Sequence, residues 1–213
     1  MQRTNAPVET VPYLISVIPP NRLDFLVKKC EEILCRTPGN VLEVGVYKGG
    51  SLVRLAEMVK RICPNFKVYG IDTFTGHPYT DNHPVHPKGK YSDVSLAELR
   101  RQIDTKGLSP WIVLYPGLVE QILPDLPILD VSFAHIDCDL YVPVRYCAIE
   151  VPKLLQSGSM IYFDDYGHQH CPGATKAVEE VFLKGSIYRS LYERRLYMLV
   201  LLYRALPVVQ WTS

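Results

Sequence analysis

Hydrophobic positions along this chain fall into two kinds of run, and the two kinds alternate. Short, nearly continuous apolar runs bounded by Gly, Pro or Asp predict buried strands. Longer runs with apolar residues three and four positions apart predict helices between them. The predicted strands are residues 40–46, 66–72, 111–117, 131–137 and 159–165, and the predicted helices are 22–36, 51–63, 96–108, 142–156 and 174–185. Strands that are apolar on both faces and alternate with helices predict an α/β fold with a doubly wound, mostly parallel sheet.

Two further segments complete the predicted fold. Residues 186–203 form two apolar runs around a charged turn, which predicts a C-terminal antiparallel hairpin and brings the sheet to seven strands. Residues 74–95 are polar and rich in Pro, His and Gly, which is typical of a functional loop such as a lid. No repeat or linker interrupts the chain, so we expect one domain over residues 1–213, with a helical lead-in at 1–38.

Composition excludes several classes of partner. The chain has 213 residues, 47% of them hydrophobic, and a net charge of +1, so no basic surface for nucleic acid is expected. No apolar run reaches the roughly 18 residues that span a bilayer. Prolines and acids break up the N-terminal segment, so we expect no signal peptide and a cytoplasmic protein.

The six cysteines are scattered and form no CxxC pair. The HQHC segment, His168 to Cys171, offers ligands that zinc accepts. A zinc site needs a second group of ligands from elsewhere in the chain, and the sequence alone does not reveal one. The histidines of the long loop, His77, His83 and His86, are expected to be solvated.

Acidic residues end two of the predicted strands. Asp137 and Asp139 follow one apolar run, and Asp164 and Asp165 end another. The carboxyl ends of neighbouring parallel strands meet at one edge, and clustered carboxylates there are costly unless a cation or hydrogen bonds compensate them. Hard oxygen ligands favour Mg²⁺, with Mn²⁺ and Ca²⁺ as looser fits, whereas a solvated strand end with turn caps is the simpler alternative.

The first predicted strand runs into a glycine-rich turn, LEVGVYKGGS. Gly45 permits a tight turn, and Gly49 leaves the following helix N-terminus accessible to polar groups of a ligand. Asp72 ends the next strand, where a carboxylate can accept hydrogen bonds from ribose hydroxyls. The chain lacks GxGxxG, which favours S-adenosylmethionine over NAD as the nucleoside cofactor.

Four segments carry a resemblance to a known family: LEVGVYKGGS, IDTFTGHP, HIDCDLYVP, and FDDYG followed by PGATKAVEEVF. The chain resembles class I S-adenosylmethionine-dependent methyltransferases with a Rossmann-like sheet, and more narrowly the macrocin O-methyltransferase (TylF-type) family. The resemblance implies a Mg²⁺ ion held by Asp137, Asp164 and Asp165, with Asp139 as the general base. The donor site that it implies comprises Glu43, Gly45, Tyr47, Gly49, Ser51, Asp72 and Thr73. Thr75 stands where the family often has an acid.

The sequence therefore predicts a Mg²⁺-dependent enzyme that methylates a hydroxyl of a small molecule, such as a natural-product sugar or phenol. Two alternatives stay open at this point: a cephalosporin- or rhamnose-modifying methyltransferase, and an inactive methyltransferase fold that acts as a binding protein. A small-molecule acceptor, no nucleic acid or membrane partner, and a possible homo-oligomer complete the expectation.

Overall fold

A mixed β-sheet forms the centre of the computed structural model, which describes residues 12–81, 84–128, 130–183 and 199–202. Its strands are β1 (Asn40–Val44), β2 (Val68–Asp72), β3 (Ile112–Pro116), β4 (Val131–Ile136), β5 (Leu155–Phe163) and β6 (Leu199–Leu202). They lie in the order β3-β2-β1-β4-β5-β6, with β1 to β5 parallel and β6 antiparallel to β5. The chain direction across the sheet reverses between β1 and β4, which is where open α/β sheets bind ligands.

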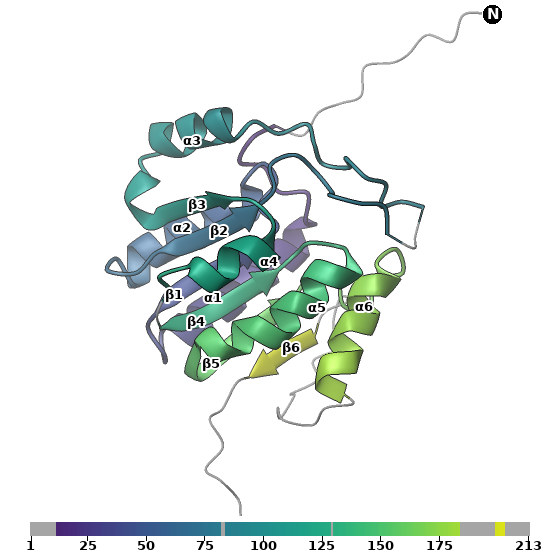
Figure 1. Ribbon diagram of the computed structural model, residues 1–213. Helices are drawn as coiled ribbons and strands as arrows, with labels where there is room; N and C mark the ends of the chain where they lie inside the picture. The colour runs from purple at the N-terminus through teal and green to yellow at the C-terminus, as the bar shows by residue number, and fades with distance from the viewer. Residues whose placement is uncertain (1–11, 82–83, 129, 184–198, 203–213) are drawn as a thin grey trace, which may run out of the picture.

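Helices cover both faces of this sheet (Figure 1). One face carries α1 (Pro20–Leu34) and α2 (Gly50–Ile62), with α3 (Leu96–Thr105) beside them. The other carries α4 (Val119–Ile122), α5 (Tyr141–Glu150) and α6 (Pro172–Val178). Short helical turns lie at η1 (Ser109–Trp111), η2 (Leu123–Asp125), η3 (Val151–Leu154) and η4 (Glu179–Leu183).

The strands are apolar on both faces because helices cover both faces of the sheet. Successive side chains of a strand point to opposite faces. Val41 therefore packs in the core under α1 and α2, and its neighbour Leu42 packs in the core under α5 and α6; both are fully buried. The predicted doubly wound parallel sheet is confirmed.

The structure differs from the sequence prediction in several places. The helix predicted at 142–156 ends at Glu150, because Pro152 lacks a backbone N–H, and the chain passes through η3 into a longer β5. Helix α2 begins after Gly49, whose φ of 82° is left-handed, and so starts two residues earlier than a cap at Ser51 would give. Helix α4 was not predicted, since four residues carry too little periodicity.

The seven-strand count is not confirmed. The structure describes five parallel strands and the antiparallel β6. The first arm of the predicted hairpin and the predicted helix end at Gly185 lie outside the described residues.

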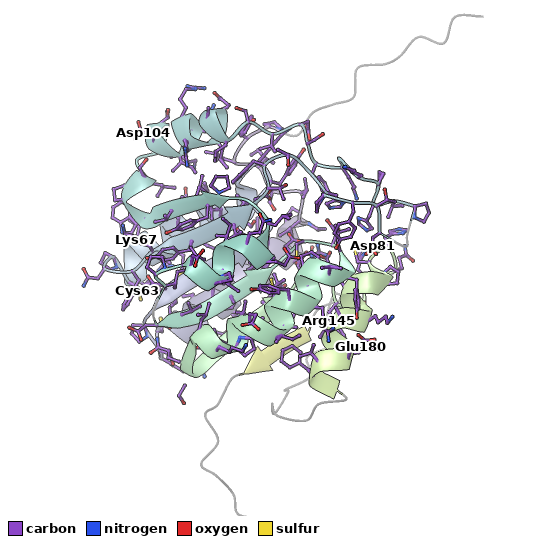
Figure 2. The ribbon with its side chains drawn as sticks, viewed as in Figure 1. Cys63, Lys67, Asp81, Asp104, Arg145 and Glu180 are labelled. Carbon is purple, nitrogen blue, oxygen red and sulfur yellow. The ribbon has the colours of Figure 1, made fainter. Side chains whose placement is uncertain are left out.

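The loop between β2 and α3 crosses the carboxyl edge of the sheet (Figure 1). Its residue Asp81 reaches the start of α5, where the Tyr141 backbone N–H donates to the Asp81 carboxylate over 3.2 Å (Figure 2). The predicted lid loop therefore lies over the strand ends that carry the acidic residues. No helix in the described part of the chain is long and apolar enough to cross a membrane.

Candidate active site

A cavity of about 660 Å³ lies at the carboxyl edge of the sheet. Six segments form its walls: the segment leading into α1, the β1–α2 turn, the end of β2 with the following loop, the residues after β3, the residues after β4, and the residues after β5. Of the predicted site residues, those that line the cavity are Gly45, Tyr47, Ser51, Asp72, Thr73, Asp137, Asp139 and Asp165. The cavity thus unites the predicted donor site and most of the predicted acidic cluster.

Gly45 brings these two halves into contact. Its φ is 94°, and a Cβ atom added there would lie 1.7 Å from the carbonyl oxygen of Asp137. Its N–H donates to the Ile71 carbonyl over 2.9 Å, so the turn is also fixed to β2. Glycine is required at this position both by conformation and by space.

Gly45→Ala should therefore lower the free energy of unfolding by about 2–5 kcal/mol, the sum of a left-handed alanine and an overpacked contact. Gly107→Ala is the matched control, because Gly107 also has a positive φ, 65°, but nothing lies within 4 Å of its added Cβ. The control should lose only about 1–2 kcal/mol. Urea denaturation of both variants measures the difference, and equal losses would contradict the close approach of β1 and β4.

Asp72 organises the glycine turn. Its carboxylate accepts hydrogen bonds from the backbone N–H groups of Val46 and Tyr47, each at 2.8 Å, and of Phe74, at 2.7 Å. The sequence suggested a contact with ribose, with a helix or turn cap as the alternative role. The structure adds that Asp72 holds the turn after β1 and the start of the long loop in place.

Two predicted donor residues do not line the cavity. Gly49 caps α2, with the Leu99 side chain against it. Glu43 is fully buried in the core, where its carboxylate pairs with His135 Nδ1 at 2.8 Å. The prediction that Glu43 contacts the donor needs correcting, because strand alternation turns its side chain into the core beneath α1.

The three predicted metal ligands follow β4 and β5, but the structure does not bring them into one ligand group. Asp137 and Asp164 have ligand atoms within 4.8 Å of each other, whereas Asp165 groups with Asp139 and Cys171, and Asp164 does not line the cavity. Asp164 is fully buried and forms an ion pair with Arg22 of α1, while its Oδ1 atom has no hydrogen-bond partner among the described residues. Loss of hydration and repulsion between the carboxylates raise the pKa of both Asp137 and Asp165 well above its usual range. An orphaned carboxylate oxygen and mutually repelling acids fit a hard divalent cation such as Mg²⁺.

Arg22 was not predicted as a site residue. It stands before the first apolar position of α1, where an arginine is ordinarily a solvated helix residue, and only the packing of α1 against β4 and β5 brings it to the acids.

Asp139 occupies a different environment from the other acids. Its φ of 59° turns the chain between β4 and α5, and its carboxylate lies 3.1 Å from His77 Nε2. Burial alone would raise the pKa of Asp139, but the hydrogen bond with His77 and the proximity of His86 lower it. Its backbone N–H donates to the Asp165 carboxylate over 2.9 Å, which connects it to the acidic cluster. Asp139 is thus poised as a carboxylate beside the acidic cluster.

The expectation of solvated loop histidines is wrong for the two that the structure describes. The His77 side chain is 9% exposed and the His86 side chain 3% exposed, and both face Asp139. His83 lies outside the described residues. A polar loop gives no sequence signal of burial, so these contacts could not be predicted.

A doubly wound sheet with a glycine turn after β1, an acid after β2 and an acidic cluster after β4 and β5 defines a protein of the α/β methyltransferase class. The chain belongs to the macrocin O-methyltransferase family: the profile described as "Macrocin-O-methyltransferase (TylF)" matches residues 3–187. This match confirms the resemblance that the four sequence segments predicted.

Individual relatives agree with this assignment. Mycinamicin III 3''-O-methyltransferase from Micromonospora griseorubida is 28% identical over 169 residues, which cover 72% of this chain and 65% of that protein. Thus the match spans slightly less than two thirds of the relative's length. The solved O-methyltransferase NovP has a TM-score of 0.77 at 23% identity, over 89% of this chain and 82% of NovP. The calicheamicin methyltransferase CalS11 has a TM-score of 0.70 at 23% identity, over 88% and 87% of the two chains. These two structures show the shared fold.

Proposed function

We propose that this protein is a Mg²⁺-dependent O-methyltransferase that moves a methyl group from S-adenosylmethionine to a hydroxyl of a small natural-product sugar or phenol. The observation that carries the proposal is the carboxylate of Asp139, held by His77 in the same cavity as the glycine turn and the acidic cluster. The names of the relatives support a natural-product acceptor, and the solved methyltransferase TomG from Streptomyces achromogenes was crystallised with S-adenosylmethionine.

The donor side of the cavity is built to orient a nucleoside. The Asp72 carboxylate fixes the turn through the backbone N–H groups of Val46 and Tyr47. Its remaining lone pairs can accept hydrogen bonds from the ribose hydroxyls. Bound S-adenosylmethionine would supply a methyl group activated on a sulfonium. Alignment of that group with the acceptor is the main contribution of the protein.

The acidic side of the cavity would hold the metal and the acceptor. Asp137, Asp164 and Asp165 would hold Mg²⁺, which supplies a Lewis acid that lowers the pKa of an acceptor hydroxyl. Three carboxylates around a divalent ion leave one net negative charge. The Arg22 guanidinium, which forms an ion pair with Asp164, offsets that charge. Asp139 would accept the hydroxyl proton, since it is a carboxylate at neutral pH and His77 holds it at the wall of the cavity.

A direct test is incubation with Mg²⁺, isotopically methyl-labelled S-adenosylmethionine and a panel of glycosides and catechols. Transfer of label to an acceptor oxygen supports the proposal. Donor binding without transfer to any hydroxyl acceptor would favour the inactive binding protein instead, and absence of donor binding would refute both.

Asp72→Ala should weaken binding of S-adenosylhomocysteine by about 1.5–3 kcal/mol, the scale for loss of hydrogen bonds to a charged group. The variant should also lower the melting temperature, because three backbone N–H groups lose their acceptor. Asp72→Asn keeps one carbonyl oxygen and should be affected less in both respects. Calorimetric titration and thermal denaturation measure the two effects, and unchanged affinity in Asp72→Ala would remove Asp72 from the donor site.

A further inference from the structure

Further metal-ligating side chains surround Asp139, next to the acidic cluster. His77 and His86 from the long loop form one group with Asp139 after β4, and Cys171 at the start of α6 groups with Asp139 and Asp165. The nitrogen and oxygen ligand atoms of His77, His86 and Asp139 all lie within 4.8 Å of one another. The set of two imidazoles, one carboxylate and one thiol is chemically unlike the acidic cluster.

Three distances, all of them to the Asp139 carboxylate, match those between ligands of one small ion. His77 Nε2 lies 3.1 Å from Asp139 Oδ2, and His86 Nδ1 lies 3.6 Å from Asp139 Oδ1. The Cys171 sulfur lies 3.5 Å from the same Oδ1 atom. Zinc–nitrogen bonds of about 2.0–2.1 Å and zinc–sulfur bonds of about 2.3 Å in a tetrahedron put neighbouring ligand atoms about 3.3–3.7 Å apart.

The surroundings of His86 also suit a ligand. Its Nε2 atom lies 2.7 Å from the carbonyl oxygen of His170, which can accept the Nε2 proton and leave Nδ1 turned toward Asp139. A histidine that binds a metal through one nitrogen commonly donates from the other to a carbonyl or carboxylate. The side chain is buried, at 2% exposure for the residue, so its orientation is set by the fold.

We propose that His77, His86, Asp139 and Cys171 form a binding site for a borderline transition-metal ion of the Zn²⁺ class, next to the proposed Mg²⁺ site, whose ligand Asp165 contacts both Asp139 and Cys171. The sequence showed the HQHC segment as an incomplete zinc motif that lacked a second group of ligands. The fold supplies that group from the long loop. Nitrogen and sulfur ligands select Zn²⁺ or Co²⁺ over Mg²⁺, which the neighbouring carboxylates select.

Two groups near the proposed site disfavour a bound cation and must change when it binds: an ammonium that must move away and a thiol that must lose its proton. The Lys90 ammonium lies 3.5 Å from His86 Nδ1 and would have to withdraw along its flexible side chain. Burial and nearby acids raise the pKa of the Cys171 thiol, but a coordinating thiol is deprotonated by the metal. Binding would therefore release the Cys171 proton to solvent. The sulfur also contacts Asp165 Oδ1 at 3.4 Å, His86 Nε2 at 3.5 Å and His168 Nδ1 at 3.7 Å.

Occupation of this site would join three parts of the molecule. The loop contributes His77 and His86, the end of β4 contributes Asp139, and the start of α6 contributes Cys171. The ion would therefore clamp the loop over the cavity. It would also engage the carboxylate that the proposed function uses as a base, so that the zinc-bound form is closed and inactive.

Cobalt titration of the whole chain tests the site without recourse to activity. Excess Mg²⁺ is present throughout to occupy the acidic cluster. We expect one tight Co²⁺ ion per chain, strong visible absorption typical of tetrahedral cobalt, a near-ultraviolet band from the thiolate bond, and displacement of both by Zn²⁺. Only weak octahedral absorption, with no thiolate band, overturns the proposal.

Variants identify the ligands. Cys171→Ser should abolish the thiolate band, and His86→Asn should weaken Co²⁺ binding by about 100-fold or more. Cys35→Ser is the control, since Cys35 is an exposed thiol at the end of α1, and this variant should leave both signals unchanged.

A thiolate band that survives Cys171→Ser but disappears in Cys35→Ser would assign the binding to a surface thiol and refute the site. Thermal denaturation of each variant establishes that it is folded, and the two ligand variants lie in separate segments, so a folding failure in one leaves the other decisive.

Discussion

Replacing Asp139 by Asn is expected to lower turnover by about 10²–10⁴, the usual contribution of a general base. Affinities for Mg²⁺ and donor should stay close to wild type, because Asp137, Asp164 and Asp165 remain. Raising the pH should recover part of the loss, since hydroxide can take the proton from a metal-bound hydroxyl. Single-turnover rates against pH, together with metal titrations, measure both effects.

Asp104→Asn provides the charge-matched control. Asp104 lies on α3, away from the cavity-lining residues, so the variant should keep full activity (Figure 2). If Asp139→Asn lost Mg²⁺ while Asp137→Asn kept it, the roles of the two acids would have to be exchanged. If neither variant slowed turnover, the acidic residues after β4 would have no catalytic role.

Removal of Mg²⁺ with EDTA is expected to abolish turnover, and added Mg²⁺ to restore it. Asp137→Asn should lose metal affinity and turnover together, since a neutral amide is a poorer ligand for a hard cation. High Mg²⁺ concentrations should then recover some activity, which distinguishes this variant from Asp139→Asn. Full turnover by the metal-free protein on its acceptor would refute the metal-dependent mechanism.

The same cluster predicts how stability depends on pH. The pKa of Asp137 and of Asp165 is raised in the folded protein, so between about pH 4 and the raised values the folded state binds more protons than the unfolded state. The stability of the metal-free protein should therefore fall as the pH rises through this window. Asp137→Asn should reduce this fall, and Mg²⁺ should raise the melting temperature of the wild type more at pH 8 than at pH 5. Calorimetric scans with and without Mg²⁺ at both pH values measure the dependence.

The sequence reveals the elements of this site better than its contacts. Asp137 and Asp164 could be placed at one edge because apolar runs mark strands and parallel strands end on the same side. The role of Glu43 was misjudged because its partner, His135, is fixed by the register of β1 against β4, which pairs these two residues directly. Register depends on how the whole sheet assembles, and a single sequence does not display it.

The loop residues show a different limit. Burial of His86 depends on where residues far along the chain, such as His170, come to lie. A segment rich in Pro, Gly and His has no periodicity from which such packing can be inferred. The contact of Arg22 with the acids could not be predicted for a similar reason. An arginine at the start of an amphipathic helix is ordinarily solvated, and only the packing of α1 against β4 and β5 brings this one to the acids.

The long loop is anchored at both ends by hydrogen bonds to residues outside it. At one end the Phe74 N–H donates to Asp72, and at the other the Ser95 N–H donates to the Tyr13 hydroxyl over 2.6 Å while the Ser95 side chain caps α3. A chimera in which the residues between these two anchors are replaced by another loop is therefore expected to keep the glycine turn after β1 and the cap of α3, and to lose the contacts that the loop makes with Asp139 and with the start of α5.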